Sequence, residues 1–198
     1  MRRLQRAADQ QRVAWRNGAG LTTELASGPP SGGAEESPLG GSSADFTWRV
    51  SLAEVTEDCD FSVFPNVDRT ILLVEGSALT LLLAGTEHTL TPYEPFHFDG
   101  GLEVSCRVPG PTRDLNIMTR RGRANATVTV LSPGQAALTI TKADPLVIVC
   151  LDGSATLQTA DTSITIGPGD VAELDEPVRT TGDGHLAVIR VETLAPAD

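Results

Sequence analysis

Two stretches of this chain repeat one arrangement of turns and short apolar runs. The first is "VEGSALTLLLAGTEHTLTPYEPFHF" (74–98) and the second is "CLDGSATLQTADTSITIGPGDVAEL" (150–174). Gly76-Ser77-Ala78 matches Gly153-Ser154-Ala155, and after a gap of one residue Leu90, Pro92 and Glu94 match Ile166, Pro168 and Asp170. Both copies read as four strands separated by turns, which predicts a fold built from one duplicated β unit.

The rest of the chain carries the same signals. Short runs rich in Val, Ile, Thr and Leu alternate with Gly, Pro, Asp and Asn, and no long segment has a helical period. Such a pattern is typical of an all-β sandwich or barrel. Residues 27–45, "SGPPSGGAEESPLGGSSAD", differ because they are rich in Gly, Pro and Ser, which predicts a flexible insertion. Its role as an active-site lid is left open.

Composition limits the partners. The formal net charge of −11 disfavours nucleic acid as a partner, because an acidic chain repels phosphates. No apolar run approaches the length of a membrane span, and none follows the basic N-terminal residues, so neither a membrane nor a secretory signal is expected. Three widely spaced cysteines, an odd number, indicate reduced thiols in the cytoplasm.

The stretch "IGPGDVAEL" resembles the cupin motif, and two copies of the unit indicate a bicupin of two small antiparallel, jelly-roll-like β-barrels. Further stretches, in order along the chain, resemble the HutD/Ves family of bacterial cupin-type proteins. They are "WRNGAGLTTEL" (15–25), "FTWRVSLAEV" (46–55), "FSVFPNVDRT" (61–70), "LLVEG" (72–76) and "GPTRDLNIMTRRG" (110–122). We therefore expect an N-terminal barrel over 1–122, which carries these motifs, and a C-terminal barrel over 123–198, joined in one compact unit.

The resemblance implies a cytoplasmic protein that binds a small carboxylated metabolite. It also implies an accessory or regulatory role in histidine utilisation or related amino-acid metabolism, because the family takes its first name from histidine-utilisation gene clusters. The alternative is a metal-independent isomerase or lyase on the same fold, with His97, Tyr93 and Glu54 as acid–base candidates. A homodimer is left open.

Metal binding is not expected. A cupin metal site needs two or three histidines and a carboxylate on neighbouring strands, whereas this chain has His88, His97 and His185 scattered among different turns and strands. No nucleophile motif is present either. The sequence thus predicts a small-molecule carboxylate as ligand, with no metal and no cofactor.

The segment "GPTRDLNIMTR" (110–120) contains the central candidates. Strand side chains alternate between two faces, so Asp114, Asn116 and Met118 share one face and Leu115 and Ile117 share the other. In a barrel the polar face can point inward, and we expect Asn116 to line a polar cavity in the N-terminal barrel. Leu115 and Ile117 would pack on the opposite side.

Arginines are expected near Asn116, because a guanidinium can hold a carboxylate through two parallel hydrogen bonds. Arg49, Arg69 and Arg113 lie in the family-like stretches and are the candidates. Internal ion pairs are the alternative for these arginines, with Asp68, Asp114 or Glu54 as partners.

Four more residues complete the predicted site. The resemblance makes Asn17, Thr22 and Glu24 candidates near the cavity. His97 has two readings of similar weight: it lines the cavity as a hydrogen-bonding group, or it is a surface or internally satisfied histidine.

Overall fold

The computed structural model describes residues 1–15, 18–29 and 46–195. The chain divides into two compact units. The first barrel comprises Gln11–Asn125 with the chain that follows Glu192, and the second barrel comprises Met1–Gln10 and Ala126–Glu192. The sequence alone assigned the first ten residues to the N-terminal barrel, whereas here they group with the C-terminal one.

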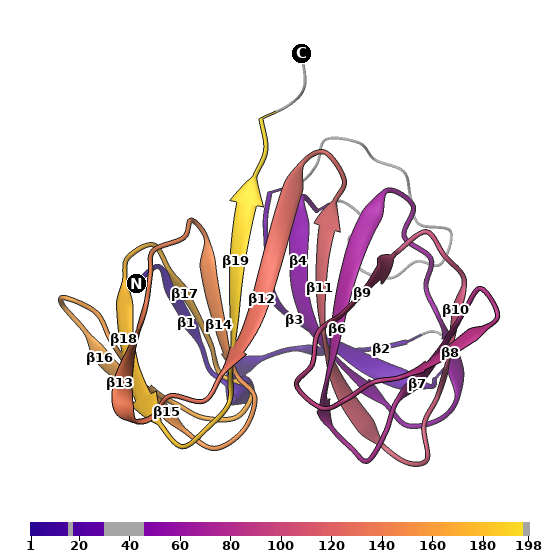
Figure 1. Cartoon of the computed structure of the whole chain (residues 1–198), viewed down its shortest axis with the longest axis horizontal. Coiled ribbons are helices and arrows are strands. Elements are labelled where there is room, and N and C mark those ends of the chain that lie inside the picture. The colour runs from indigo at the N-terminus through magenta and orange to yellow at the C-terminus, as the bar shows by residue number, and fades with distance from the viewer. Residues whose placement is uncertain (16–17, 30–45, 196–198) are drawn as a thin grey trace. The chain divides into compact units, whose positions relative to one another are not determined.

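Two antiparallel sheets form the first barrel (Figure 1). The larger sheet has six strands, in the order β2 (Arg12–Ala14), β3 (Gly20–Ser27), β4 (Trp48–Val55), β11 (Thr112–Arg120), β6 (Val67–Glu75) and β9 (Phe96–Asp99). The smaller sheet has four, in the order β5 (Cys59–Phe61), β10 (Val104–Arg107), β7 (Thr80–Leu83) and β8 (Thr86–Thr89).

The second barrel also has two antiparallel sheets. Its larger sheet has the order β1 (Arg3–Gln5), β17 (Val171–Leu174), β14 (Leu146–Cys150), β19 (Leu186–Thr193) and β12 (Ala124–Leu131). The smaller has the order β13 (Gly134–Ile140), β18 (Val178–Gly182), β15 (Ala155–Gln158) and β16 (Ser163–Ile166). In Figure 1 the indigo strand β1 lies beside the orange strand β17, although the two come from opposite ends of the sequence.

Helix is nearly absent from the described residues, in which only η1 (Ala7–Asp9) is helical, as a single 3-10 turn. Consistent with this, none of the described helices has the length and apolar character needed to span a membrane.

The duplicated sequence unit adopts one hairpin arrangement twice. In the first copy β6 pairs with β9 and β7 with β8, and in the second copy β14 pairs with β17 and β15 with β16. The next strands match as well, since β10 pairs with β7 as β18 pairs with β15. Gly76 and Gly153, the matched turn glycines, both have positive φ, which glycine adopts without steric cost. The predicted internal repeat is therefore confirmed.

Strand β11 lies between β4 and β6, and its register fixes which side chains face the interior of the first barrel. Asp114 is opposite Leu73, and Asn116 is opposite Ile71. Directly opposite residues share one face of a sheet. Leu73 and Ile71 belong to the apolar core that also contains residues of the smaller sheet, so Asp114 and Asn116 point inward.

The other face of β11 is also closed to solvent. Leu115 and Ile117 are 0% and 3% exposed and lie opposite Leu52 and Val50 of β4. The strand is therefore buried on both faces, as expected from its sequence. A polar row inside a closed barrel then requires either an internal partner or a ligand.

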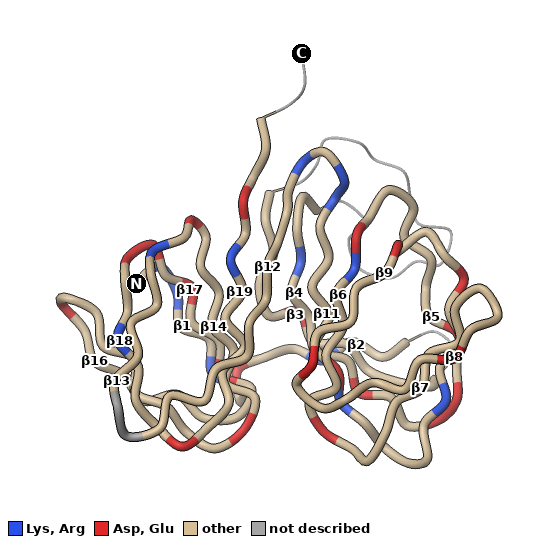
Figure 2. Tube along the Cα trace, viewed as in Figure 1, with Lys and Arg blue, Asp and Glu red and all other residues tan. Residues whose placement is uncertain are grey.

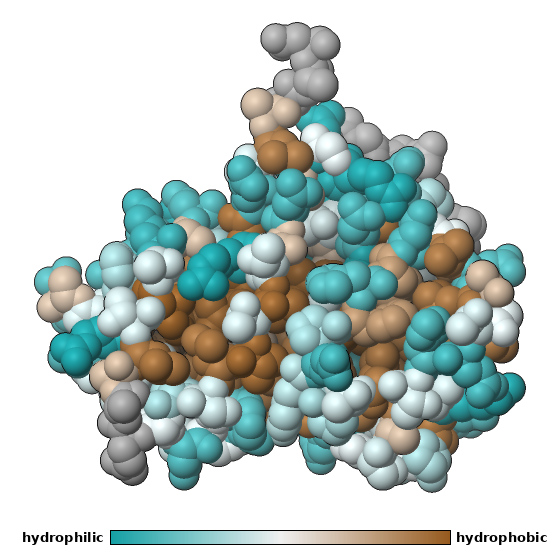
Figure 3. Space-filling model, viewed as in Figure 1, coloured by the Kyte–Doolittle hydropathy of each residue, from teal (hydrophilic) through white to brown (hydrophobic). Residues whose placement is uncertain are grey.

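The interior of the second barrel is mostly apolar. Thr180 of β18 is a buried polar side chain on the inner face, 1% exposed and opposite Leu157. The apolar core consists of twelve buried residues: Ile140, Leu146, Ile148, Cys150, Ala155, Leu157, Ile166, Ala172, Leu174, Val178, Leu186 and Val188. On the face shown in Figure 3, apolar residues gather over the strands of this barrel within a hydrophilic rim.

Candidate functional site

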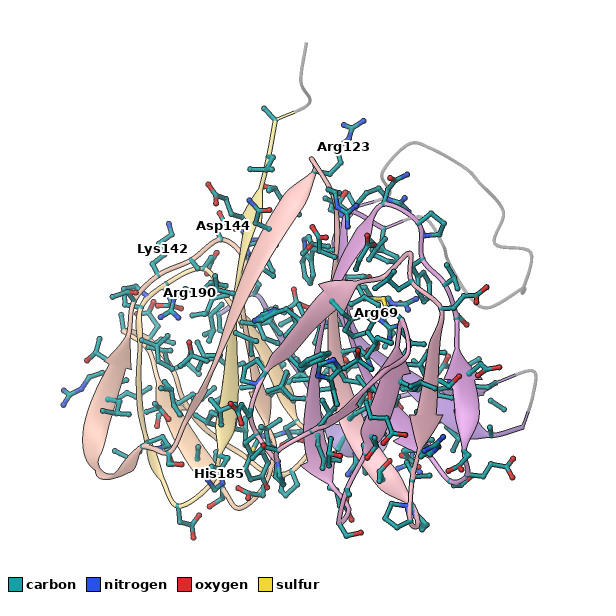
Figure 4. The ribbon with its side chains drawn as sticks, turned by 45° about the vertical axis from the view of Figure 1, so that its right-hand side comes forward. Arg69, Arg123, Lys142, Asp144, His185 and Arg190 are labelled. Carbon is teal, nitrogen blue, oxygen red and sulfur yellow. The ribbon has the colours of Figure 1, made fainter. Side chains whose placement is uncertain are left out.

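Two neighbouring strands bring a polar row together on the inner face of the first barrel. Arg69 of β6 and Asp114 and Asn116 of β11 are 5%, 0% and 4% exposed. The guanidinium of Arg69 donates from Nη2 to Asn116 Oδ1 at 2.6 Å, and Asn116 Nδ2 donates to Asp114 Oδ1. Asn116 thus connects a buried cation to a buried carboxyl group, and Figure 4 shows Arg69 among the strands of this barrel.

A second arginine extends the row. Arg49 of β4 is opposite Met118 of β11, and Arg69 of β6 is opposite the same methionine from the other side. Arg49 Nη2 is 3.4 Å from Met118 Sδ, a weak acceptor. Figure 2 shows a blue segment within each of β4 and β6, the two strands that carry these arginines. Both guanidinium groups therefore lie on one face, separated by β11.

Aromatic rings surround the two guanidinium groups. The Cζ atom of Arg49 is 4.9 Å from the ring centre of Phe46 and 5.5 Å from that of Phe64. The Cζ atom of Arg69 is 5.7 Å from Phe64, and Phe61 and Phe98 lie at 5.3 Å and 4.9 Å. Cation–π contacts offset part of the cost of removing a guanidinium from water, and they fix its plane.

Burial changes the acid–base properties of the row. It raises the pKa of Asp114 from 3.8 to about 7, and the positive charge of Arg69 and the hydrogen bond from Asn116 lower it only in part. Burial also lowers the pKa of Arg69 to about 10, a change that Asp114 opposes and Arg49 adds to. Near neutral pH the row therefore contains a charged Arg69 and an Asp114 that is ionised only in part.

Hydrogen-bonding capacity remains free in this row. Among the described residues, no group meets the buried atoms Arg49 Nε, Arg69 Nε and Asp114 Oδ2. A buried donor or acceptor without a partner costs about 1–3 kcal/mol, and more when it is charged. The row thus has two buried N–H donors on positively charged arginines and one carboxyl group that is only partly ionised. This arrangement favours the binding of an anion.

The remaining predicted residues on this side of the sheet differ in their surroundings. Thr22 of β3 is opposite Ala53 of β4, and its Oγ1 accepts a 2.6 Å hydrogen bond from the indole of Trp15. Glu24 is exposed, accepts from Ser27 Oγ at 2.8 Å, and its charge raises the pKa of Arg49 against the larger lowering by burial. Asn17 and residues 30–45 of the insertion lie outside the described residues.

His97 is not in the polar row. It is exposed and lies opposite Thr70 in the β6–β9 pair, and its Nδ1 is 2.7 Å from Thr70 Oγ1. Phe96 and Phe98, its two neighbours, pack against the core of the barrel. Because strand side chains alternate, His97 must then face outward, so the prediction that it lines the interior is wrong and the satisfied-histidine reading holds.

Arg113 is also on the outer face. It lies opposite Glu54 and Glu75 on the two neighbouring strands, and its Nη1 is 3.4 Å from Glu75 Oε2. One residue away along the strand, Asp114 points inward, so Arg113 cannot share its face. The ion-pair alternative is therefore the one observed for Arg113.

The other carboxylates suggested as arginine partners have partners elsewhere. Asp68 accepts from Arg121 Nη2 at 2.6 Å, and Glu54 Oε1 is 3.6 Å from Arg12 Nε. Glu54 shares the outer face with Arg113, away from the polar row. Tyr93 lies in the turn between β8 and β9 with a positive φ of 64°.

No metal centre was found in the part of the chain that the structure describes, where no three His, Cys, Asp or Glu side chains gather in ligand geometry. His88 packs its ring 4.9 Å from that of Phe96, and His185 contacts Asp152 Oδ2 at 2.9 Å from Nδ1. The histidines therefore serve separate local contacts. In Figure 4, His185 lies at an end of the second barrel.

Sequence reasoning missed the aromatic surroundings of the arginines. All five phenylalanines of the chain fall between residues 46 and 98, and four of their rings contact Arg49 or Arg69. That clustering was a usable signal, because the rest of the chain has no phenylalanine. It assigns the aromatic content of the protein to the barrel that carries the polar row.

Comparison with known proteins agrees with these features. The chain matches the family model described as HutD over residues 7–188. Protein Ves of Cronobacter sakazakii is 40% identical over 119 residues, which are 59% of this chain. This match covers 59% of the length of that relative. A second match, to Protein Ves of Citrobacter koseri, covers 56% of the length of that protein. The predicted resemblance to HutD and Ves is therefore confirmed.

Solved structures show the same architecture. HutD from Pseudomonas fluorescens SBW25, in a structure described by its formate condition, superposes with a TM-score of 0.80 and 25% identity over 98% of this chain and 99% of that one. A cupin 2 conserved barrel domain protein from Leptotrichia buccalis gives a TM-score of 0.60 at 10% identity over 87% and 89% of the two chains, a likeness of fold alone. The predicted bicupin fold is confirmed.

Proposed function

Because the chain belongs to the HutD family, we propose that its first barrel binds a small carboxylated metabolite. In this proposal the protein is a cytoplasmic accessory or regulatory component of histidine utilisation or related amino-acid metabolism. The ligand carboxylate would lie between Arg49 and Arg69, and Asn116 and Asp114 would contact a second polar group of the ligand.

The observation that carries the proposal is the imbalance of charge in the polar row. Two guanidinium groups share the face with one buried carboxyl group, whose pKa is raised to about 7. The Nε donors of both arginines have no partner among the described residues. A carboxylate supplies a negative charge and acceptors for these donors at once, and arginine binds it in a planar, two-bond geometry.

The aromatic rings support the same ligand class. They hold both guanidinium planes in place before a ligand arrives, which lowers the conformational entropy lost on binding. They also exclude water from around the charges, which strengthens a charge-assisted hydrogen bond. The proposed role in histidine utilisation rests on the match to the HutD family, whereas Protein Ves matches only part of this chain.

Calorimetric titration of the purified chain tests the proposal. The ligands would be sodium formate and the carboxylic acids of histidine breakdown, each paired with its neutral amide. We expect the acids to bind and the amides not to bind. Formate is the smallest carboxylate, and a structure of HutD from P. fluorescens is described by a formate condition. A ligand at about 100 times its dissociation constant should add about 2.7 kcal/mol to the stability of the protein.

A pair of variants separates binding from folding. Arg49→Lys should lose most of the affinity and still fold, because an ammonium cannot reproduce the planar guanidinium. Leu115→Ala, on the opposite face, should do the reverse and cost about 2–5 kcal/mol of stability through the cavity it leaves. If Arg49→Lys unfolds the chain and the remaining affinity is unchanged, Arg49 is structural and the proposed site is wrong.

Asp114 favours a second candidate function, a metal-independent isomerase or lyase. A carboxyl group with a pKa of about 7 can both take up and release a proton at neutral pH, as a general acid–base requires. Exchange of ligand protons for deuterium in heavy water would reveal it. Exchange that disappears in Asp114→Asn while binding persists supports the enzyme, and binding without exchange supports the ligand-binding protein.

A further inference from the structure

Two cysteines of the first barrel face each other across neighbouring strands. Cys59 of β5 is directly opposite Cys106 of β10, and the two Sγ atoms are 3.2 Å apart. Both are free thiols. Opposite residues of antiparallel strands have Cα atoms about 4.5–5.5 Å apart, which lies within the span of a disulfide. The pair can therefore join without a rearrangement of the backbone.

The two sulfurs differ in access. Cys106 is 2% exposed and belongs to the core of the barrel, whereas Cys59 is half-buried and lies on β5, the edge strand of the smaller sheet. Cys59 is therefore the more accessible of the two thiols, although its side chain packs against the core that contains Cys106. This is the arrangement of an exposed thiol with a resolving partner.

Electrostatics couple the pair. The hydrogen bond between the sulfurs raises the pKa of Cys59, as do burial and the carboxylates of Asp114 and Asp60. The same bond lowers the pKa of Cys106.

A metal site is a poorer explanation of this pair. In the described parts of the chain no third His, Cys, Asp or Glu joins the two sulfurs in ligand geometry, whereas a structural zinc site needs four ligands. Cys150 of the second barrel provides the contrast, since its thiol donates to the carbonyl oxygen of Asp152 at 3.2 Å. It is a buried thiol of ordinary kind.

We propose that Cys59 and Cys106 are a reversible redox site, which forms a disulfide across β5 and β10 on exposure to a peroxide. In the first step the peroxide O–O bond breaks, an S–O bond forms on one of the two sulfurs, and one water leaves with the proton of that thiol. In the second step the other sulfur attacks the oxidised one, the S–S bond replaces the S–O bond and a second water leaves. Two thiols and one peroxide thus give one disulfide and two waters, and a thiol reductant restores the dithiol.

The site is placed to change the wall of the polar row. Phe61 follows Cys59 by two residues on β5, and its ring contacts both the guanidinium of Arg69 and the indole of Trp15. A disulfide would fasten this three-residue edge strand to β10 and so restrain the ring. The redox inference does not depend on the proposed function, because it rests on the two sulfurs alone.

Peptide mapping of the folded protein tests the inference. Hydrogen peroxide treatment, alkylation of the remaining thiols and proteolysis should yield one cross-linked peptide pair, Cys59 with Cys106, lighter by two hydrogen atoms. Cys150 should be recovered alkylated, and dithiothreitol should restore two free thiols. The oxidised protein should melt higher by about 5 °C or more, because the bond closes a long loop.

Matched variants complete the test. Cys150→Ser should keep the whole response, and Cys59→Ser should lose both the cross-link and the shift in melting temperature. Mapping of the unaltered chain decides the question even where a variant folds poorly. The inference is overturned if the folded chain gives no Cys59–Cys106 peptide, if either of these cysteines accumulates as the sulfinic acid, or if cross-links join separate chains.

Discussion

The two barrels carry opposite kinds of side chain at matching interior positions. The strands on either side of β6 and β14 pair in the same order, so three residues of the polar row have counterparts in the second barrel. The matched pairs are Arg69 and Leu146, Asn116 and Val188, and Asp114 and Leu186. Each apolar counterpart is 0% exposed and belongs to the core.

This difference separates what the fold needs from what the site needs. The second barrel closes around an interior that is mostly apolar, with the hydroxyl of Thr180 as a buried polar group, so the packing of apolar side chains is enough to form the architecture. The first barrel retains a buried cation, a buried carboxyl group and unpaired donors, which weaken an interior unless something offsets them. The fold itself therefore does not require the polar row, which agrees with the proposed role of the row in ligand recognition.

The largest loss of stability is expected when a polar side chain of the first barrel is placed at the matching core position of the second barrel. Leu186→Asp gives this barrel the carboxyl group that Asp114 provides in the first, but without its polar neighbours, because the counterparts of Arg69 and Asn116 are Leu146 and Val188. An unpaired buried carboxyl group should cost about 4–5 kcal/mol or more of stability. Denaturant melts measure it, with Leu186→Met as the control of matched size. A loss below about 1 kcal/mol would mean that this interior is not dry.

A comparable loss of stability is expected in the first barrel when a single residue of its polar row is replaced. Arg69→Leu leaves Asp114 and Asn116 buried without their cation and should cost about 3–5 kcal/mol. The triple variant Arg69→Leu, Asn116→Val and Asp114→Leu copies the second barrel and should recover that stability while it abolishes carboxylate binding. Melts and titrations of both variants test this, and a triple variant less stable than the single one would contradict it.

Stability should depend on pH through Asp114. Its pKa is about 7 in the folded chain against an ordinary 3.8, so the folded state holds the proton more tightly. This contribution is fully present below about pH 4 and is lost as the pH rises towards 7 and beyond, by roughly 3–4 kcal/mol. Asp114→Asn removes the dependence. Melts of both proteins from pH 4 to pH 8 measure the difference, and parallel profiles would exclude a buried, protonated Asp114.

The smallest effect is expected on the outer face. His97→Ala removes the hydrogen bond with Thr70 and should cost about 1 kcal/mol, with no change in carboxylate affinity. Thermal melts and titration with the same acid measure the two quantities. A loss of affinity in His97→Ala would return this residue to the site and oppose the register seen in β9.

The sequence predicted much of the fold because the turns repeat. Gly76 and Gly153 have the positive φ that their matching turns require. Short strands joined by such turns are typical of a closed barrel. The partner of β1 could not be predicted in this way. A three-residue strand has too little pattern of its own, and its pairing with β17 depends on tertiary contacts.

The site was harder to predict because alternation gives two faces without saying which is inside. For β11 the flanking Leu115 and Ile117 suited either side, since both faces are buried. For β9 the same alternation put the side chain of His97 on one face of the strand and those of Phe96 and Phe98 on the other. Only the core contacts of the two phenylalanines show that the histidine faces outward. The link between Arg69 and Asn116 joins residues 47 positions apart, beyond the reach of local pattern.

The pairing of β1 with β17 has a consequence for how the protein can be divided. Arg3 and Glu173 are 170 positions apart, and Asp170 is held further by Arg6 and by the backbone N–H of Ala7. The first barrel is nearly contiguous in the gene, whereas the second is assembled from two separated segments. A fragment of residues 126–192 would leave β17 as an uncovered edge, open to pairing with other chains. A circular permutation that joins residues 1–10 to this segment is the way to obtain the second barrel as a single genetic module.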